Sequence, residues 1–144
     1  MTLVLQVIAT VTTGLFAGAA LYINLVEHPA RMASGTAAAL SEWRPSYKRA
    51  TLMQVPLALV SAATGLLLWL VGEGQLWLLG AFLMAAIIPF TLFVIFPTNR
   101  FLLSKAAESD PGASDALRRW NRLHAVRTLL TCAAFVIFLF VHAR

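Results

Sequence analysis

Two histidines, His28 and His124, stand in short polar stretches of a chain that is otherwise strongly apolar. An imidazole can act as a general acid or base near neutral pH, and it is also a common ligand of metals and haem. His28 belongs to the stretch NLVEHPAR at residues 24–31, and His124 to the stretch WNRLHAVR at residues 120–127. These two imidazoles are the first candidates for the reactive groups of a site.

Each histidine has polar neighbours at helical spacing. Residues three, four or seven apart share one face of a helix. Asn24 and Arg31 are spaced in this way from His28, and Glu27 is spaced in this way from Asn24 and Arg31. For His124 the neighbours at this spacing are Trp120, Asn121, Arg127 and Thr128. Both stretches therefore predict a helix with one polar face. A pairing of Glu27 with Arg31 would be the simplest structural reason for that carboxylate.

Several chemistries could use these residue types. Two histidines and one carboxylate could form an iron-binding facial triad, and His28 paired with His124 could hold a b-type haem. Acid–base chemistry without a cofactor, on an apolar substrate, fits the same residues. The sequence contains no HExxH, CxxC, P-loop or glycine-rich fingerprint, so no metal ligand set is assigned and the cofactor stays open.

Four apolar runs are long enough to cross a membrane. Of the 144 residues, 60% are hydrophobic and only 12% are charged, unlike the composition of soluble domains. The runs cover about residues 2–26, 50–71, 75–96 and 125–141, and a bilayer core takes about 20 residues of helix. The sequence therefore predicts one all-α domain over residues 1–144, an integral membrane four-helix bundle with up-down topology.

The basic residues predict the orientation of this bundle. Ten of the eleven Lys and Arg residues lie between spans one and two or from the end of span three to the first residues of span four, and Arg144 alone lies beyond span four. Because positive charge marks cytoplasmic loops, we expect both termini on the non-cytoplasmic side of the inner (plasma) membrane. The net charge of +5 is then a topology signal with some attraction to membrane lipid, and it indicates no nucleic-acid partner.

The polar residues gather at one membrane face. In an up-down bundle, the ends of spans one and three lie beside the starts of spans two and four. Trp43, Tyr47 and Gln54 stand at the start of span two, and Asn99 follows span three. The pattern predicts a polar pocket at the cytoplasmic face. Its candidate catalytic residues are His124, His28, Glu27 and Arg127, and its candidate substrate-binding residues are Asn24, Trp43, Tyr47, Gln54, Asn99, Trp120 and Asn121.

Three local patterns add to this layout. The four tryptophans, at positions 43, 69, 77 and 120, fall at span boundaries, where Trp typically forms an interfacial belt. Gly14 and Gly18 form a GxxxG pattern, which predicts close helix packing in span one. Ser114 is placed to cap an extended fourth helix.

Four short motifs together resemble a known family. NLVEHPAR ends span one, WRPSYKRATLMQ precedes span two, FPTNRFL follows span three and WNRLHAVR precedes span four. The combination is similar to the anthrone oxygenase-like family of small four-helix integral membrane proteins, over nearly the whole chain. The resemblance implies the four-helix membrane fold and an oxidoreductase acting on a lipophilic aromatic substrate.

The resemblance also implies a reaction. Anthrones are converted to anthraquinones when a base removes a proton from the methylene beside a carbonyl, the enolate meets dioxygen, and the resulting peroxide collapses to the quinone. His124 or His28 would be the base. The developing oxyanion would accept hydrogen bonds from Arg127, Asn121, Asn24 or Tyr47.

Two other function classes fit the sequence. A small carrier would need a charged residue in the middle of a span, and Glu27 lies at a boundary instead. A noncatalytic membrane module could bind lipid, haem or a partner protein through its cytoplasmic connections. The sequence does not determine the substrate or the oligomeric state.

Overall fold

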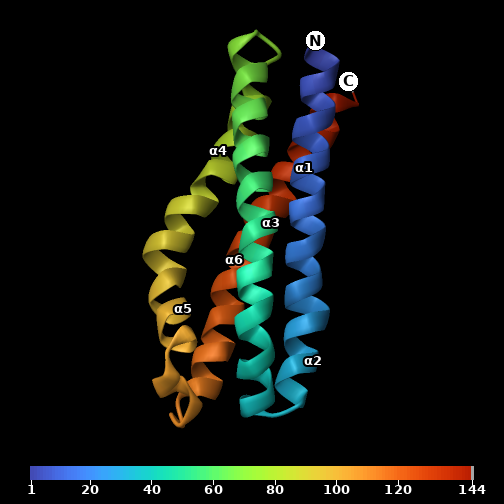
Figure 1. Cartoon of the computed structure of the whole chain (residues 1–144). Helices are drawn as coiled ribbons and strands as arrows, with labels where there is room; N and C mark the ends of the chain where they lie inside the picture. Colours follow the sequence, from blue (N-terminus) through green and yellow to red (C-terminus); the bar gives the residue numbers. More distant parts are fainter. Residues whose placement is uncertain (144) are drawn as a thin grey trace.

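The computed structural model describes residues 1–143, and every regular element in that range is a helix (Figure 1). Four continuous helical stretches are long and apolar enough to cross a membrane: Thr2–Ala33, Thr36–Leu70, Gln75–Leu103 and Ala113–His142. They confirm the prediction of an all-helical protein with four helices of spanning length, as a multi-pass membrane protein requires. Arg144, the basic residue beyond the fourth span, lies outside the described residues.

Two of the four stretches contain a π-helical segment. The first stretch consists of α1 (Thr2–Tyr22), the π-helical η1 (Ile23–Glu27) and α2 (His28–Ala33). The second is α3 (Thr36–Leu70), and the third consists of α4 (Gln75–Phe90), the π-helical η2 (Thr91–Ile95) and α5 (Phe96–Leu103). A short 3-10 helix, η3 (Lys105–Glu108), leads to α6 (Ala113–His142).

Both π-helical segments lie beside a proline, although Pro45, Pro56 and Pro89 stand in α-helical segments without such a bulge. Each ends two residues before a proline, Pro29 after η1 and Pro97 after η2. A proline inside a helix has no N–H to donate, and its ring collides with the carbonyl four residues earlier. The helix widens by one residue around that carbonyl instead of breaking, and such bulges are frequent at functional sites.

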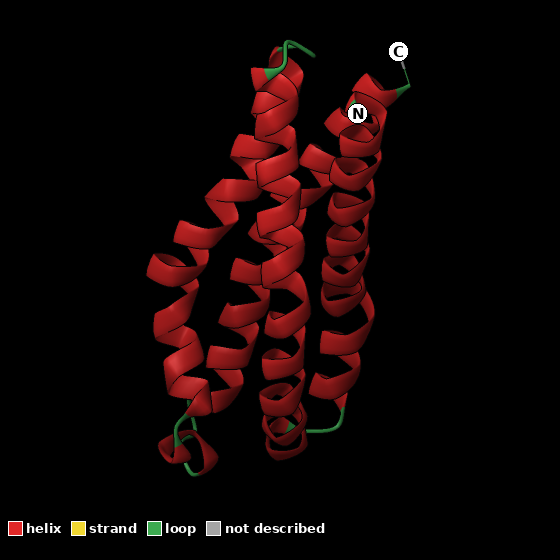
Figure 2. Ribbon diagram, turned by 45° about the horizontal axis from the view of Figure 1, so that its top comes forward, coloured by secondary structure: helices red, strands yellow, loops and turns green. Residues whose placement is uncertain are grey.

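The helices pack as a ring, with α1 and α4 each lying against both α3 and α6. Both chain ends lie at the same end of the bundle as the α3–α4 turn, at the top of Figure 1. The α2–α3 connection and η3 lie at the other end, and the tilted view in Figure 2 shows the same grouping. The polar stretches at residues 24–31 and 120–127 are therefore on neighbouring helices toward the lower end.

The helices continue well past the apolar runs. The basic residues expected in two long connections are mostly helical, and the first connection consists only of Ser34 and Gly35. Hydropathy marks where lipid ends, whereas a helix ends where the backbone must turn, here at Gly35 with a φ of 88°. Ser114 does not cap α6, because the N-cap is Gly112, whose N–H donates to Asp110 Oδ1 at 2.7 Å.

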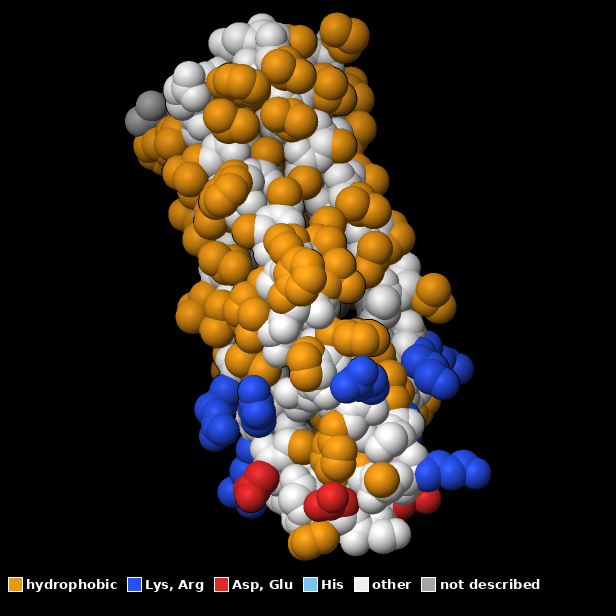
Figure 3. All heavy atoms as spheres, turned by 90° about the vertical axis from the view of Figure 1, so that its left-hand side faces the viewer, with side chains coloured by type: hydrophobic (Ala, Val, Ile, Leu, Met, Phe, Trp, Pro, Cys, Tyr) orange, Lys and Arg blue, Asp and Glu red, His pale blue; other side chains and the backbone are white. Residues whose placement is uncertain are grey.

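The tryptophans do not form a lipid-facing belt. Trp43, Trp77 and Trp120 are buried, and only Trp69 is partly exposed. Trp43 and Trp120 belong to the core cluster nearest the lower end, and Trp77 packs with Phe138 near the upper end. The outer surface is instead covered by aliphatic side chains and Phe, and Lys and Arg gather in a band toward the lower end (Figure 3).

Candidate functional site

A cavity of about 340 Å³ lies between the helices where the polar stretches meet. All four helical stretches contribute side chains to its wall, which is mostly apolar. Of the residues predicted from the sequence, six line it: Trp43, Tyr47, Gln54, Trp120, His124 and Arg127. The other five lie behind the wall or beside it: Asn24, Glu27, His28, Asn99 and Asn121.

His124 is held from behind by Asn24 of η1. The Nδ1 atom of the buried His124 lies 2.8 Å from Asn24 Oδ1, and the Thr128 hydroxyl donates to the same oxygen. The Asn24 amide donates in turn to the carbonyl and the side-chain oxygen of Asn121, at 3.1 and 2.7 Å. The widened turn of η1 thus presents one amide to three residues of α6.

The hydrogen bond to Asn24 determines which ring nitrogen of a neutral His124 carries the proton. Because Asn24 Oδ1 can only accept, a neutral His124 carries its proton on Nδ1 and donates it to that oxygen. Nε2 of His124 is then an acceptor, and no described residue donates a hydrogen bond to it. His124 therefore offers a basic nitrogen from a ring that forms part of the cavity wall.

Arg127 lies one turn further along α6 and crosses the cavity toward α3. Its Nη2 donates to Gln54 Oε1 at 2.9 Å, and the guanidinium carbon lies 5.4 Å from the centre of the Phe16 ring. Arg127 Nε and Gln54 Nε2 are buried and have no hydrogen-bond partner among the described residues. The wall therefore holds a cation and two unused donors close to His124.

Aromatic rings form one side of the cavity. Tyr47 and Trp43 stack with centroids 5.0 Å apart, and Trp43 meets Trp120 edge to face at 5.6 Å. Trp120 lies 4.8 Å from the ring of His124 and 5.7 Å from that of His28. The Tyr47 hydroxyl accepts a bond of 3.3 Å from the buried Asn99. A flat aromatic molecule would find stacking partners here.

His28 and His124 are neighbours of the same indole, as their positions in the sequence predicted, but they face the site differently. His28 is buried outside the cavity wall, and its Nδ1 has no partner among the described residues. Asn24 and Glu27 also point apart, toward α6 and α3 respectively. The predicted single polar face at residues 24–31 is therefore divided between two neighbouring helices.

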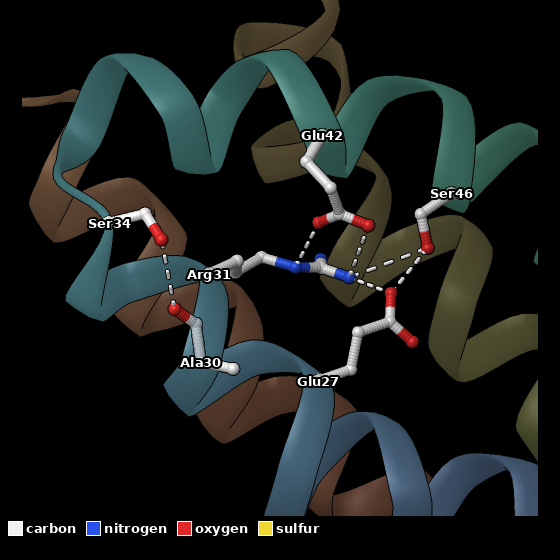
Figure 4. Close-up of polar contacts among 6 residues, drawn as sticks. All are labelled: Glu27, Ala30, Arg31, Ser34, Glu42 and Ser46. Carbon is white, nitrogen blue, oxygen red and sulfur yellow. Dashed lines mark hydrogen bonds and ion pairs between the residues drawn. The ribbon is translucent and has the colours of Figure 1, made fainter.

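Glu27 pairs with Arg31, as the spacing of four residues predicted. Figure 4 shows that the pair belongs to a larger cluster, because Arg31 also meets Glu42 of α3, and the hydroxyl of Ser46 donates to Glu27 at 2.6 Å. Glu42 and Ser46 were not among the residues expected at this site from the sequence. Both lie on α3 four residues apart, so they share one face of that helix. This spacing was the feature of the sequence that could have identified them.

The positions of the possible ligand side chains can be compared with the two cofactors considered from the sequence, an iron held by a facial triad and a b-type haem. Within residues 1–143, no three His, Cys, Asp or Glu side chains converge in a way that could hold a metal ion, so the facial triad finds no ligand set there. The Trp120 ring contacts both His28 and His124, and the bond from His124 Nδ1 to Asn24 leaves Nε2 as the nitrogen that could accept a proton or bind a metal.

A family model described as anthrone oxygenase matches residues 43–137. The matched range begins at Trp43 and contains all six predicted residues that line the cavity, whereas Asn24 and His28 precede it. A search of curated proteins and a search of solved structures gave no match.

Proposed function

The chain belongs to the anthrone oxygenase family, and we propose that it is a membrane oxidoreductase that oxidises a lipophilic aromatic substrate at an activated methylene group. Anthrone is the simplest such substrate, with a methylene acidified by the ring carbonyl. The observation that carries the proposal is the orientation of His124, whose Nδ1 bonds Asn24 and whose ring forms part of the cavity wall.

His124 is the proposed general base. A neutral imidazole with a fixed tautomer needs no rearrangement before it accepts a proton, and such a base typically accelerates proton transfer by about 10² to 10⁴. Arg127 would stabilise the enolate oxygen, because a cation in an apolar cavity interacts strongly with a charge that develops during the reaction. Trp43, Tyr47 and Trp120 would hold the flat rings.

The reaction balances with dioxygen alone as the oxidant. The methylene C–H bond breaks, its proton passes to Nε2 of His124, and the electron pair becomes an enolate. The enolate carbon forms a bond to dioxygen, which is reduced to a hydroperoxide as it takes the proton back. Loss of the second methylene proton and cleavage of the O–O bond leave the quinone carbonyl and one water.

Substrate would reach the cavity from the bilayer. The lining residues exposed on the outer surface include Val55 and Leu59 of α3, Leu92 of η2 and Phe96 of α5. They border an opening between α3 and the third helical stretch, on a part of the surface covered by apolar side chains. A greasy substrate would pass between these side chains without leaving hydrocarbon.

The proposed arrangement is an up-down bundle in the inner membrane, with both termini on the non-cytoplasmic side. The band of Lys and Arg at the lower end in Figure 3 supports this orientation by the positive-inside rule. The site then lies near the cytoplasmic leaflet. Single cysteines introduced at Gly35 and Gly74, in a background lacking Cys132, should be labelled from the cytoplasmic and outer side respectively; the reverse pattern would overturn the orientation.

The function is tested by replacing His124 and, as the control, His142, which lies at the far end of α6. His124→Ala should slow the conversion of anthrone to anthraquinone by the purified protein by at least about 100-fold. His142→Ala should leave the rate within about twofold of wild type. Equal losses in both variants, or full activity in His124→Ala, would contradict the assignment.

A further inference from the structure

Two arginines line the cavity, and they differ in whether a carboxylate of residues 1–143 balances their charge. Arg31 is neutralised within the protein by Glu27 and Glu42. Arg127 has no carboxylate of residues 1–143 within ion-pair distance, and its one hydrogen-bond acceptor there is the neutral amide oxygen of Gln54. Both guanidinium groups line the same cavity, so the difference between them requires an explanation.

A cation in an apolar cavity without a counter-charge is costly, and such residues usually pair with another group or mark a substrate or ion site. The unused donors support this reading. Arg127 Nε, Gln54 Nε2 and Trp43 Nε1 are buried without an acceptor among residues 1–143, and all three residues line the cavity. These are donor groups, so the partner that would satisfy them is an acceptor.

We propose that Arg127 and Gln54 form a binding subsite for an anionic oxygen, and that the natural ligand is a lipophilic aromatic acid bound as its anion. A planar guanidinium matches a carboxylate or phenolate oxygen better than a hydrated inorganic anion, and the apolar wall excludes strongly hydrated ions. The cavity volume of about 340 Å³ is at the lower end for ligand sites. The inference rests on the proposed function only in treating this cavity as the substrate site.

The anionic subsite is distinct from the base. Arg127 would bind an oxygen that is already charged in the free ligand, so the preference for an anion should be present before any chemistry. The preference for an anionic ligand should therefore remain when His124 is replaced, whereas the oxidation of the substrate should be lost.

The test compares two probes of nearly the same shape, one anionic and one neutral. Anthracene-2-carboxylate and anthracene-2-carboxamide are titrated into the full-length protein in nanodiscs of zwitterionic lipid, with empty nanodiscs as the partition control. Binding is read from energy transfer between the cavity tryptophans and the anthracene. The wild type should bind the carboxylate at least about tenfold more tightly than the carboxamide.

Arg127→Gln should remove most of this preference by weakening carboxylate binding, and carboxamide binding should stay unchanged. Arg122→Gln is the matched control, because Arg122 is exposed on the same helix and its loss changes the net charge equally. Equal wild-type affinities for the two probes, or the same loss in Arg122→Gln, would overturn the proposal. If Arg127→Gln does not assemble, the wild-type comparison still decides.

The same titration separates this proposal from the proposed reaction. His124→Ala should keep the carboxylate preference and lose anthrone oxidation. A wild-type protein that prefers the carboxylate but does not oxidise anthrone would support the subsite and contradict the reaction. A protein that oxidises anthrone with no preference between the probes would support the reaction and contradict the anionic subsite.

Discussion

The four helices pack differently at the two ends of the bundle. At the end near the termini, Phe138 fits against Gly65 and Gly80 and stacks on Trp77 with centroids 4.9 Å apart. We refer to these four residues as the closed end. At the other end, large polar and aromatic side chains leave a cavity among Trp43, Trp120, His124 and Arg127, here the cavity end.

The difference lies in unfilled volume more than in polarity. Thr10, Trp77 and His142 toward the closed end also have buried polar atoms without partners among residues 1–143, but these residues do not line the cavity. Glycines at the closed end let an aromatic ring approach the backbone and fill the space. The cavity end has no such filler, and its helices are widened by η1 and η2. Space for a ligand and the reactive residues therefore coincide.

The largest expected effect on stability comes from filling the closed end. A Cβ at Gly80 would lie 2.2 Å from the Phe138 ring, so Gly80→Ala should lower the free energy of unfolding by about 1 to 3 kcal/mol. The activity of the protein that remains folded should be near wild type. Denaturation in mixed detergent micelles, followed by circular dichroism, measures the change.

Gly18→Ala is the matched control for Gly80→Ala. Gly18 faces outward, and a Cβ there would meet nothing within 4 Å, in contrast to the close packing predicted from the GxxxG pattern. Within that pattern only Gly14 packs closely, against Phe135. Gly18→Ala should be neutral or stabilising by up to about 1 kcal/mol. Similar destabilisation by both substitutions would show that the closed end is not closely packed.

A smaller effect is expected at the cavity end from Asn24→Ala. Without the Asn24 acceptor, the imidazole of His124 can place its proton on Nε2, so kcat should fall by about tenfold. KM should change little, because Asn24 does not line the cavity. Asn24→Asp keeps an acceptor and should recover part of the rate. A rise in KM with unchanged kcat would assign Asn24 to substrate binding instead.

The smallest effect is expected at the outer rim beyond the closed end. Gln6 donates to Glu73 at 3.0 Å in a partly exposed bond between α1 and the α3–α4 turn. Gln6→Ala should change the free energy of unfolding by only about 0.5 kcal/mol, because water replaces such a bond easily. Activity assays should show no change; a loss of more than about twofold would mean that the two ends are coupled.

The sequence predicted the number of long helices well because bilayer thickness dictates the length of the apolar runs. The apolar runs located four helices, and helical spacing brought Trp43, Tyr47, Gln54, Trp120, His124 and Arg127 to one cavity. Spacing within a helix also predicted the pair of Glu27 and Arg31. These features depend on local periodicity, which a sequence contains directly.

Features that depend on contacts between helices were not predictable in the same way. The burial of Trp43, Trp77 and Trp120 results from their facing other helices, whereas their positions at span boundaries suggested a lipid belt. The widening at η1 sends Asn24 and Glu27 to different neighbours, and a periodicity of 3.6 residues does not describe a π-helical segment. The roles of Glu42 and Ser46 likewise required the position of α3 relative to α2.

The central claim, that His124 removes a proton from a substrate bound at the cavity end, is tested most directly without oxygen. Under anaerobic conditions in deuterated water, the reaction should stop at the enolate, so the methylene hydrogens of anthrone should exchange with solvent deuterium. Exchange followed by NMR should be faster with wild-type protein and with His142→Ala than in buffer, and His124→Ala should not exceed the buffer rate. Exchange that is equally fast with His124→Ala, or absent with the wild type, would contradict the account.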